Sequence, residues 1–459
     1  MIFIYHEFKN GKTIVVIGDI ILDHYIKNNK SHFYLGGAAN VAVNIANTKT
    51  NVYLIGLLGN DRRGHLILKK LIKQKINTSL VIQERIYKTN YKKRNITKSG
   101  EISLLSSIDN AVKISFDHWN FIIEEVIKIM DRVDLFVVSD YQKGMIDKNI
   151  WKKLIELADR HNKRVIVDSK SELSIFKNAY LIKPNLNELQ NYCARQIISE
   201  VDIYEASHKL MEVTKSKVIL TTCGKSGMHW FNKTGKSLFK KADTKKCIND
   251  LGAGDTVLSY VAFGLVHFFS EENIIKLANL AAAEQVNSLF TKRISFEKVM
   301  EKYFYMNKKI IDKNNLCLLR NHLKNKTIVF TNGCFDLLHV GHVRLLKYAA
   351  QLGNILVVGV NSDLSVAKIK GNARPIIKLK ERIELLSSLE CVDYIVCFDE
   401  IKPIELIKVL KPDILVKGLD YLDRDFSGKK EVEELGGKVF LCPFAANVST
   451  TDIIKKINS

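Results

Sequence analysis

The sequence predicts an α/β protein with two domains, each built on a mostly parallel sheet. Short runs rich in β-branched residues alternate with longer segments of helical spacing. A polar stretch rich in lysine and asparagine interrupts this alternation near residues 300–325, and a second alternating series follows it. The length of 459 residues also exceeds what one hydrophobic core usually supports.

The predicted strands read as short apolar runs, which is typical of strands buried on both faces by helices. In the first series we expect strands at 13–19, 51–59, 135–140, 164–169 and 217–222. In the second we expect them at 327–333, 354–363, 394–399, 413–420 and 438–444. We therefore predict domains at 1–304 and 326–459, joined by a linker with one helix at 305–325.

Composition excludes several classes of protein. Hydrophobic residues make up 46% of the chain and charged residues 26%, and no apolar run approaches the roughly 20 residues that span a bilayer. The amino-terminal stretch lacks the pattern of a signal peptide, so we expect a cytoplasmic protein that crosses no membrane. The eight cysteines include no CxxC pair, which favours reduced thiols over disulfides or a zinc site.

The formal charge of +21 raises the question of a nucleic-acid partner. Residues 326–459 hold 19 basic and 17 acidic residues, so the excess lies in the first part of the chain, on helices with solvated lysines. No arginine-rich stripe with interleaved aromatic residues is present. We therefore expect no nucleic-acid partner, and favour attraction of small phosphorylated anions.

The motif "GAGDT" at 252–256 opens a segment that is apolar almost all round and so predicts a buried helix. Gly252 and Gly254 allow a tight backbone whose N–H groups can bind an anion at the helix start. Asp255 would lie at the edge of that anion, where a carboxylate can take a proton from an attacking hydroxyl. The alternative is that Asp255 only caps the helix.

Further motifs stand in a fixed order before this one. "GDIILDHY" supplies Asp19 and Asp23 after the first strand, and "LGGAANVAVNIA" supplies Gly36, Gly37 and Asn40 before a helix. The glycines would allow a polyol to approach the backbone, and the asparagine amide could hydrogen-bond it. "SDYQKG" (139–144) and "KPNLNE" (183–188) come next.

In this order the motifs resemble those of the ribokinase-type carbohydrate kinases. The resemblance implies that Asp255 is the catalytic base and that the sugar is held by Asp19, Gly36, Gly37 and Asn40. It also implies that ATP and magnesium lie beside the residues Asn185, Leu186, Asn187, Glu188, Gly252, Ala253 and Gly254.

The chain departs from that family at three points. The segment "HYIKNNKSHFY" (24–34) is short, so we expect a reduced strand lid over the sugar. Leu251 stands where threonine is common before the GAGD motif, and Gln142 replaces the glycine of the family's "DYGKG".

The second series carries "GCFDLLHVGH" at 333–342. His339 and His342 are three residues apart at a turn into a helix, so both rings can face one side of it. They could be zinc ligands, but only Cys334 and Asp336 stand nearby, or they could be buried structural imidazoles. We favour phosphate recognition, in which ring N–H groups stabilise the charge that develops as pyrophosphate leaves an α-phosphate.

This half resembles the HxGH nucleotidyltransferases through to its end. The motif is followed by "VNSD" (360–363), "KGNARP" (370–375), "VKGLDY" (416–421) and "VSTTDII" (448–454). The resemblance implies that His339 and His342 stabilise the transition state, and that the nucleotide site also includes Lys417, Asp420, Ser449, Thr450 and Thr451. An STT sequence before an apolar run is also an ordinary helix start.

Over nearly its whole length the chain resembles the bifunctional heptose enzymes of lipopolysaccharide synthesis. This implies two reactions: phosphorylation of D-glycero-β-D-manno-heptose 7-phosphate at O1 by ATP, and adenylyl transfer from ATP to heptose 1-phosphate. It also implies Mg²⁺ at both sites and, through the lid, a homodimer. Two alternatives stay open: a fused sugar kinase and cytidylyltransferase for another sugar or polyol phosphate, and a first domain reduced to sugar sensing or scaffolding.

Overall fold

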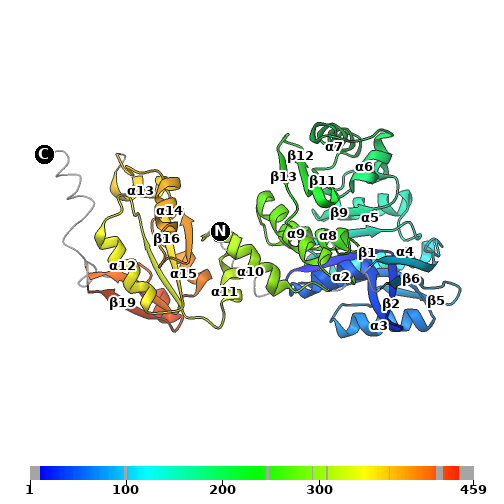
Figure 1. The fold of residues 1–459 in the computed structure, drawn as a ribbon, viewed down its shortest axis with the longest axis horizontal. Coiled ribbons are helices and arrows are strands. Elements are labelled where there is room, and N and C mark those ends of the chain that lie inside the picture. The colour runs from blue at the N-terminus through cyan, green and yellow to red at the C-terminus, as the bar shows by residue number, and fades with distance from the viewer. Residues whose placement is uncertain are drawn as a thin grey trace. The chain divides into compact units, whose positions relative to one another are not determined.

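The structure is a computed structural model, and it describes residues 11–97, 101–243, 248–291, 293–306, 309–371, 373–419 and 427–443. The chain forms two compact units, Met1–Val299 and Met300–Ser459 (Figure 1). Each unit has its own sheets and helices, so the predicted α/β architecture is confirmed.

The first unit contains a nine-stranded sheet in the order β13-β12-β11-β10-β9-β8-β1-β4-β5. Its strands pair in parallel except for β11 with β12 and β12 with β13, which are antiparallel. The strands are β1 (Thr13–Gly18), β4 (Asn51–Gly59), β5 (Val81–Glu84), β8 (Leu135–Asp140), β9 (Arg164–Ser169), β10 (Leu181–Ile182), β11 (Val218–Thr222), β12 (Met228–Asn232) and β13 (Ser237–Lys240).

Helices cover both faces of this sheet, which explains the continuous apolar runs of its strands. All residues of β1 and β8 are buried. The helices of this unit are α2 (Ala38–Asn47), α3 (Arg62–Lys73), α4 (Phe116–Ile129), α5 (Lys148–Arg160), α6 (Leu186–Cys193), α7 (Glu200–Thr214), α8 (Ala253–Val266) and α9 (Glu271–Val286). Short 3₁₀ turns are η1 (Met130–Arg132), η2 (Leu173–Ile175) and η3 (Gly224–Ser226).

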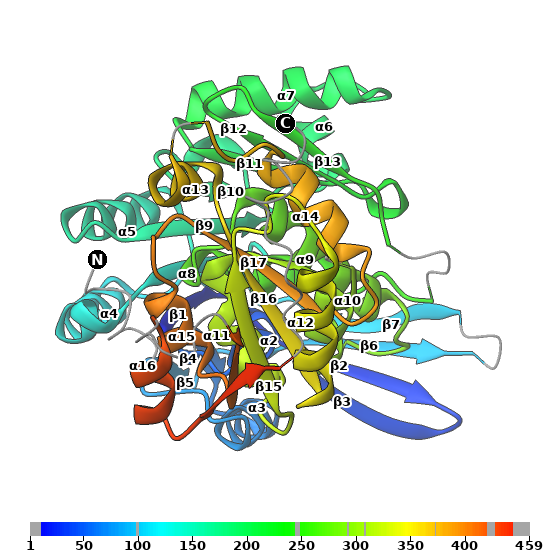
Figure 2. The same ribbon diagram turned by 90° about the vertical axis from the view of Figure 1, so that its left-hand side faces the viewer.

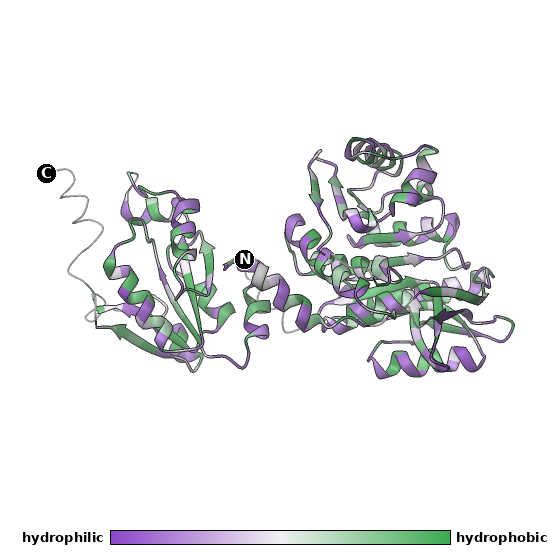
Figure 3. Ribbon diagram, viewed as in Figure 1, coloured by the Kyte–Doolittle hydropathy of each residue, from purple (hydrophilic) through white to green (hydrophobic). Residues whose placement is uncertain are grey.

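The helices differ in how much of their surface they bury. α8 and α9 pack against each other and α2 packs against α8, and every residue of α8 from Asp255 to Val266 is buried. By contrast, α3 and α5 alternate between hydrophilic and hydrophobic residues along the ribbon, as helices with one solvent face do (Figure 3). The start of α8 is therefore held rigidly against the sheet.

A second sheet of the first unit corrects the expectation of a reduced lid. It has four strands in the order β3-β2-β6-β7: β2 (Ile20–Lys27), β3 (Lys30–Gly37), β6 (Asn90–Ile96) and β7 (Ile102–Ile108). The β2–β3 hairpin is short, but β6 pairs in parallel with β2 and adds a second hairpin. Figure 2 shows the two hairpins projecting together from the main sheet. We call these four strands the lid sheet.

The second unit contains a six-stranded parallel sheet in the order β14-β17-β16-β15-β18-β19. Its strands are β14 (Ile310–Ile311), β15 (Ile328–Gly333), β16 (Ile355–Asn361), β17 (Tyr394–Phe398), β18 (Ile414–Gly418) and β19 (Lys438–Cys442). Its helices are α11 (Leu316–His322), α12 (Val340–Gln351), α13 (Asp363–Lys370), α14 (Leu379–Ser387), α15 (Ile404–Leu410) and α16 (Lys429–Glu434), with the 3₁₀ turn η4 (Lys313–Asn315).

The stretch 305–325, predicted as a linker, belongs to the second unit in its described part. α10 (Phe296–Met306) spans the division between the units. After it, β14 pairs with β17, and α11 packs against α15. Ile311, Leu316 and Leu319 are buried, so these apolar side chains complete a core rather than join two domains.

Both main sheets change strand order next to a central strand. In the first, β4 lies on one side of β1 and β8 on the other; in the second, β16 and β18 flank β15. In α/β sheets, ligands bind at the carboxyl ends of the strands at such switch points. The motifs that follow β1, β8, β15 and β18 are thereby placed at the expected ligand edge of each sheet.

Among the described residues, no helix is long and apolar enough to cross a membrane.

Candidate active sites

The start of α8 forms the centre of the first candidate site. Gly252 is its N-cap residue with φ of +79°, a left-handed conformation that glycine adopts without steric cost. No side chain caps this helix start. The Ala253 N–H donates to Asp250 O at 3.1 Å, whereas the N–H groups of Gly252 and Gly254 have no partner among the described residues and can bind an anion. The predicted residues Gly252, Ala253 and Gly254 therefore form a helix start at which Gly252 and Gly254 keep unused N–H donors.

Asp255 lies in the first turn of α8 and is 4% exposed. Its Oδ1 accepts a hydrogen bond from the Tyr141 hydroxyl at 2.8 Å, and its Oδ2 accepts one from Asn40 Nδ2 at 2.8 Å. Burial raises the pKa of Asp255 to about 6, even though these two donors lower it. A buried carboxylate with a pKa near neutrality is suited to take up a proton.

A buried ion pair lies beside this helix start. Lys183 Nζ is 2.9 Å from Asp168 Oδ2, and Lys183 is 2% exposed. A Cβ atom on Gly254 would lie 3.4 Å from Lys183 Nζ. An ammonium group here can attract an anion held at the start of α8. The sequence reasoning missed both residues, although Lys183 opens the "KPNLNE" motif directly after a buried strand.

The predicted residues 185–188 form the start of α6. Asn185 is the N-cap residue, and it forms a capping box with Glu188. Asn185 donates to Glu188 from its backbone N–H at 2.8 Å and from Nδ2 at 2.7 Å, and Glu188 also pairs with Lys170. Leu186 and Asn187 fill the first turn. The capping interaction is local, so on its own it does not identify a nucleotide site.

Three of the predicted sugar-binding residues lie at the end of β3 and the start of α2, and one of them contacts Asp255. Gly36 and Gly37 end β3, and Gly37 is the N-cap residue of α2. A Cβ atom on Gly36 would lie 2.5 Å from Asp23 Oδ2, so a larger residue does not fit there. Asn40, in the first turn of α2, reaches Asp255.

Asp19, which the sequence predicts for the sugar site, binds the loop after β8. Its carboxylate accepts hydrogen bonds from the backbone N–H groups of Tyr141 (2.7 Å), Lys143 (3.0 Å) and Met145 (3.3 Å). Burial raises the pKa of Asp19 to about 6, and the three amides lower it. Most of the acceptor capacity of this carboxylate is thus used by the loop, because Oδ2 accepts two of these bonds and Oδ1 accepts one.

Asp23 is the carboxylate that faces the Gly36 position. It lies on β2, is 6% exposed, and pairs with Arg94 of β6 at 2.5 Å. Thr291 Oγ1 donates to Asp23 Oδ2 at 3.4 Å. Both aspartates follow the first strand, and the sequence reasoning assigned the sugar to Asp19 alone. The pairing of β2 with β6 gives Asp23 a different environment, beside Arg94.

The second candidate site lies at the start of α12. His339 is the N-cap residue, and its ring centroid is 3.9 Å from that of His342. The Nδ1 atoms of both rings are buried and have no hydrogen-bond partner among the described residues. Burial, together with the charges of His339 and Lys370, lowers the pKa of His342 to about 4. The pKa of His339 is lowered by burial and Lys370.

Both imidazoles are therefore neutral near pH 7, and each keeps one ring N–H to donate. In the described ranges, no group of three or more His, Cys, Asp or Glu side chains is arranged to hold a metal ion. Asp336, which could have joined the histidines, is fully engaged by Arg374 and by the N–H groups of Ile376 and Ile377. Asp336 thus organises the "KGNARP" segment.

Arg382 of α14 joins the loops around this site, and the sequence reasoning missed it. Its side chain is fully buried and donates to the carbonyl oxygens of Cys334 (2.5 Å), Asn361 (2.9 Å) and Ile377 (3.1 Å). It also binds Asp363 Oδ1 at 2.8 Å. A buried guanidinium with carbonyl partners in three segments fixes the carboxyl ends of β15 and β16 relative to each other.

Lys417, predicted for the nucleotide site, is the last residue but one of β18. Its Nζ donates to Asn332 Oδ1 at 2.6 Å and to Asn332 O at 3.2 Å. It therefore lies at the switch point beside β15. The predictions for Asp420, Ser449, Thr450 and Thr451 fall outside the described residues.

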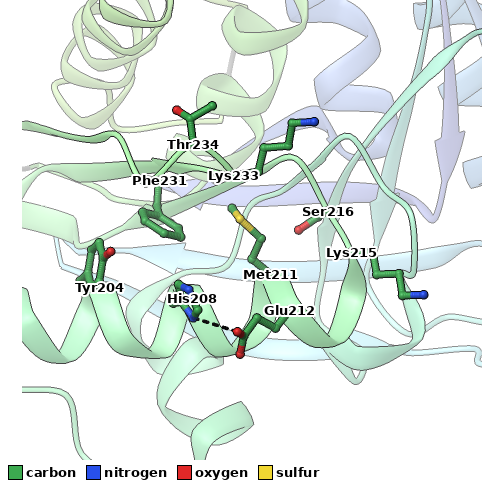
Figure 4. A pocket seen from close by; sticks show the side chains of 10 residues that line it. Tyr204, His208, Met211, Glu212, Lys215, Ser216, Phe231, Lys233 and Thr234 are labelled. Atoms are coloured by element: carbon green, nitrogen blue, oxygen red, sulfur yellow. Dashed lines mark ion pairs between the residues drawn. The ribbon is translucent and has the colours of Figure 1, made fainter.

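A cavity of about 480 Å³ lies elsewhere in the first unit, between α7 and the β12–β13 turn (Figure 4). Tyr204 and Phe231 meet there edge to face at 4.8 Å, and His208 Nδ1 lies 3.5 Å from Glu212 Oε1. Ser216, before the amino end of β11, lines it, whereas the opposite end of β11 adjoins Asn185. The cavity contains none of the predicted site residues.

Two protein families match the chain. Residues 12–293 match the pfkB family of carbohydrate kinases, and residues 330–456 match the cytidylyltransferase-like family. Together these matches show a bifunctional transferase with a kinase part and a nucleotidyltransferase part, and both activities imply the use of ATP.

Curated relatives match over nearly the full length. The bifunctional protein HldE of Helicobacter pylori strain HPAG1 is 35% identical, covering 97% of this chain and 98% of the relative. HldE of Syntrophotalea carbinolica is 32% identical, covering 96% and 95%.

Solved structures match the first unit. Phosphofructokinase-2 from Escherichia coli has a TM-score of 0.56 at 19% identity, covering 65% of this chain and 99% of that structure. Arabidopsis thaliana ribokinase has a TM-score of 0.53 at 19% identity, covering 64% and 99%. At this identity the likeness shows the fold of the first unit, which is ribokinase-like.

Proposed function

The chain belongs to the HldE family of bifunctional proteins, and from this premise we propose two consecutive reactions in ADP-heptose synthesis. The first unit transfers the γ-phosphoryl group of ATP to O1 of D-glycero-β-D-manno-heptose 7-phosphate, which gives the 1,7-bisphosphate. After a separate phosphatase has removed the 7-phosphate, the second unit transfers the adenylyl group of ATP to the heptose 1-phosphate. The products of this step are ADP-heptose and pyrophosphate.

The position of Asp255 carries the first proposal. It stands at an uncapped, glycine-rich helix start, so an acceptor hydroxyl and a bound phosphate can meet beside it. As the hydroxyl oxygen bonds to the γ-phosphorus, its proton passes to Asp255, and ADP leaves with the electrons of the broken P–O bond. The N–H groups of Gly252 and Gly254, together with Lys183, stabilise the charge on the transferred group.

ATP is assigned to the edge formed by α6 and α8, beside Asn185, Leu186, Asn187, Glu188 and the residues Gly252, Ala253 and Gly254. Mg²⁺ neutralises triphosphate charge and usually binds through phosphate oxygens, water and one or two carboxylates. The carboxylates of Glu188 and Asp168 fit such a role, because each retains acceptor capacity beside a lysine.

The acceptor sugar is assigned to Gly36, Gly37, Asn40 and Asp23. We assign Asp23 this role in place of Asp19, since its carboxylate faces the Gly36 position and Asp19 is bound by three amides. The lid sheet supplies Arg94 beside it. A carboxylate and an amide are the groups that hydrogen-bond sugar hydroxyls.

In the second unit, His339 and His342 are assigned to the phosphates of ATP. Their unpartnered Nδ1 atoms at the start of α12 and their neutral state support donation to an oxyanion. Lys417, Ser449, Thr450 and Thr451 are assigned to the same nucleotide site through the family resemblance. Residues 1–304 would then carry the kinase and residues 326–459 the nucleotidyltransferase.

We also propose a homodimer formed through the lid sheet. β7 is an edge strand of that sheet, and its Leu104 and Leu105 are 60% and 54% exposed. An edge strand with exposed leucines is suited to pairing with another chain. ATP and sugar phosphates belong to the cell interior, so the cytoplasm is the proposed location.

Two substitutions test the assignment of the two reactions. Asp255→Asn should lower heptose 7-phosphate phosphorylation at least 100-fold and leave adenylyl transfer unchanged, because a neutral amide cannot take the proton. His342→Ala should lower adenylyl transfer and leave the phosphorylation of heptose 7-phosphate unchanged. Both activities are measured on the same preparation of each variant, so each variant is the control for the other. Loss of both activities in either variant would contradict the assignment of the two reactions to separate sites.

The choice of nucleotide and the choice of sugar are tested by comparing substrates. With heptose 1-phosphate as acceptor, pyrophosphate release should require ATP. A preference for CTP would support the cytidylyltransferase alternative instead. Wild-type protein without any turnover of heptose 7-phosphate would favour the sensing role for the first unit.

A further inference from the structure

Tyr141 connects two carboxylates at the kinase site. Its backbone N–H donates to Asp19 Oδ2 at 2.7 Å, and its hydroxyl donates to Asp255 Oδ1 at 2.8 Å. Lys143 and Met145 add two further N–H bonds to Asp19, so the carboxylate holds the loop at three points. The position of the Tyr141 ring thus depends on the buried Asp19 carboxylate, which holds the backbone of its loop.

Asp255 is held from both sides by this arrangement. Asn40 of α2 donates to Oδ2 and Tyr141 of the β8 loop donates to Oδ1. A carboxylate oxygen has two lone-pair sites, so each oxygen retains one that can face an acceptor hydroxyl. Two donors in fixed positions restrict the rotation of the carboxylate. They therefore fix the directions in which its remaining lone pairs point.

The charged groups around Asp255 act in opposite directions. Asp168 opposes its ionisation, whereas Lys183 favours it, and Lys170 and Asp23 also interact within this cluster. Lys92 of the lid sheet lies 5.6 Å from the Tyr141 ring centroid. Burial beside Asp255 and Asp168 raises the pKa of Tyr141 well above 10, so its hydroxyl keeps its proton and remains a donor.

We propose that Tyr141 is a positioning residue of the phosphoryl-transfer site, which orients Asp255 and holds it in its charged form, and that Asp19 acts through Tyr141 by fixing its loop. This inference rests on the proposed role of Asp255 as the base. Tyr141 itself takes up no proton during the reaction. Without its hydroxyl, the buried carboxylate would lose one of the two side-chain hydrogen bonds that favour its charged state.

Tyr141→Phe tests the inference against a matched control. The variant should lower kcat for heptose 7-phosphate phosphorylation about 10- to 100-fold, with little change in KM for ATP. Tyr260→Phe should have no such effect. Tyr260 lies on α8, and its buried hydroxyl has no hydrogen-bond partner in the described part of the chain.

The pH profile distinguishes positioning from a structural role. Loss of the donor should move the acidic midpoint of kcat/KM upward by about one pH unit, because a hydrogen bond to a charged group favours that form. A partly unfolded variant would have a lower kcat/KM at every pH, but the midpoint of its pH profile would not change. An unchanged midpoint, or a kcat within twofold of wild type, would overturn the inference.

Asp19→Asn provides an independent test of the connection through Tyr141. It removes part of the loop anchor without touching Asp255, so it should lower kcat in the same direction and add little to Tyr141→Phe in the double variant. Full additivity of the two substitutions would contradict the connection through Tyr141. Should Asp255→Asn retain kinase activity, the proposed base would fail by itself, whatever Tyr141→Phe does.

Discussion

Asn40 Nδ2 lies 2.8 Å from Asp255 Oδ2, although 215 positions separate the two residues in the sequence. α2 and α8 pack against each other and bring their first turns together. Asn40→Ala should lower kinase kcat/KM about 10- to 100-fold, because the base loses one of its orienting donors. Steady-state kinetics with heptose 7-phosphate measures this.

Asn47 at the other end of α2 provides the control for Asn40. Its Nδ2 donates to Ile294 O at 2.5 Å and does not contact Asp255. Asn47→Ala should change stability but leave kcat/KM of the folded protein near the wild-type value. Equal kinetic losses in both variants would show that Asn40 acts through the fold alone.

The kinase rate should depend on pH with an acidic midpoint near 6. The pKa of Asp255 is raised to about 6 by burial, so the carboxylate is charged above that pH and protonated below it. A protonated base cannot accept the proton of the acceptor hydroxyl, and kcat/KM should fall about tenfold per pH unit below the midpoint. A midpoint near 4 would be inconsistent with a buried base.

Asp255→Asn should stabilise the first unit at neutral pH. In the unfolded chain the carboxyl has its ordinary pKa near 4, whereas in the folded chain the pKa is about 6. The charged form is therefore disfavoured by folding, and its cost to stability grows from about pH 4 and is complete above about pH 6. A neutral amide avoids this cost, which corresponds to about 1–3 kcal/mol.

Denaturant unfolding at two pH values checks this stabilisation. The advantage of Asp255→Asn should be present at pH 7.5 and disappear as the pH falls below about 4, where the wild-type carboxyl becomes protonated in both states. Adenylyl transfer reports that the second unit is intact. A variant less stable than wild type at pH 7.5 would contradict the prediction.

Gln142 has φ of +58°, the left-handed conformation that costs a non-glycine residue about 1 kcal/mol. Its N–H donates to Asp140 Oδ1 at 2.9 Å, a bond that glycine preserves. Gln142→Gly should therefore leave the first unit as stable as wild type or up to about 1 kcal/mol more stable. Gln142→Val should destabilise it by at least as much, as thermal unfolding would show.

Arg382→Met should destabilise the second unit by about 3–5 kcal/mol and lower adenylyl transfer. The buried guanidinium binds three carbonyl oxygens and Asp363, and its loss leaves buried acceptors without partners. Lys380→Met on the same helix is the matched control, because Lys380 is exposed and has no such contacts. Kinase activity should persist in both variants.

The sequence by itself determined the two α/β sheets and the order of the motifs. Their central strands are buried on both faces, so they need continuous apolar runs such as those at 13–18 and 135–140, and such runs are visible locally. The glycine-rich start of α8 and the two histidines of α12 were equally visible, because each depends on a few neighbouring residues.

The tertiary structure alone decided which side chains meet. Strands β6 and β7 were not predicted, because their polar and partly exposed residues lack the signature of a buried strand. The pairing of Asp23 with Arg94, and the contacts of Asn40 and Tyr141 with Asp255, depend on pairing between distant segments. Such contacts arise from the packing of whole helices and strands, which local spacing does not encode.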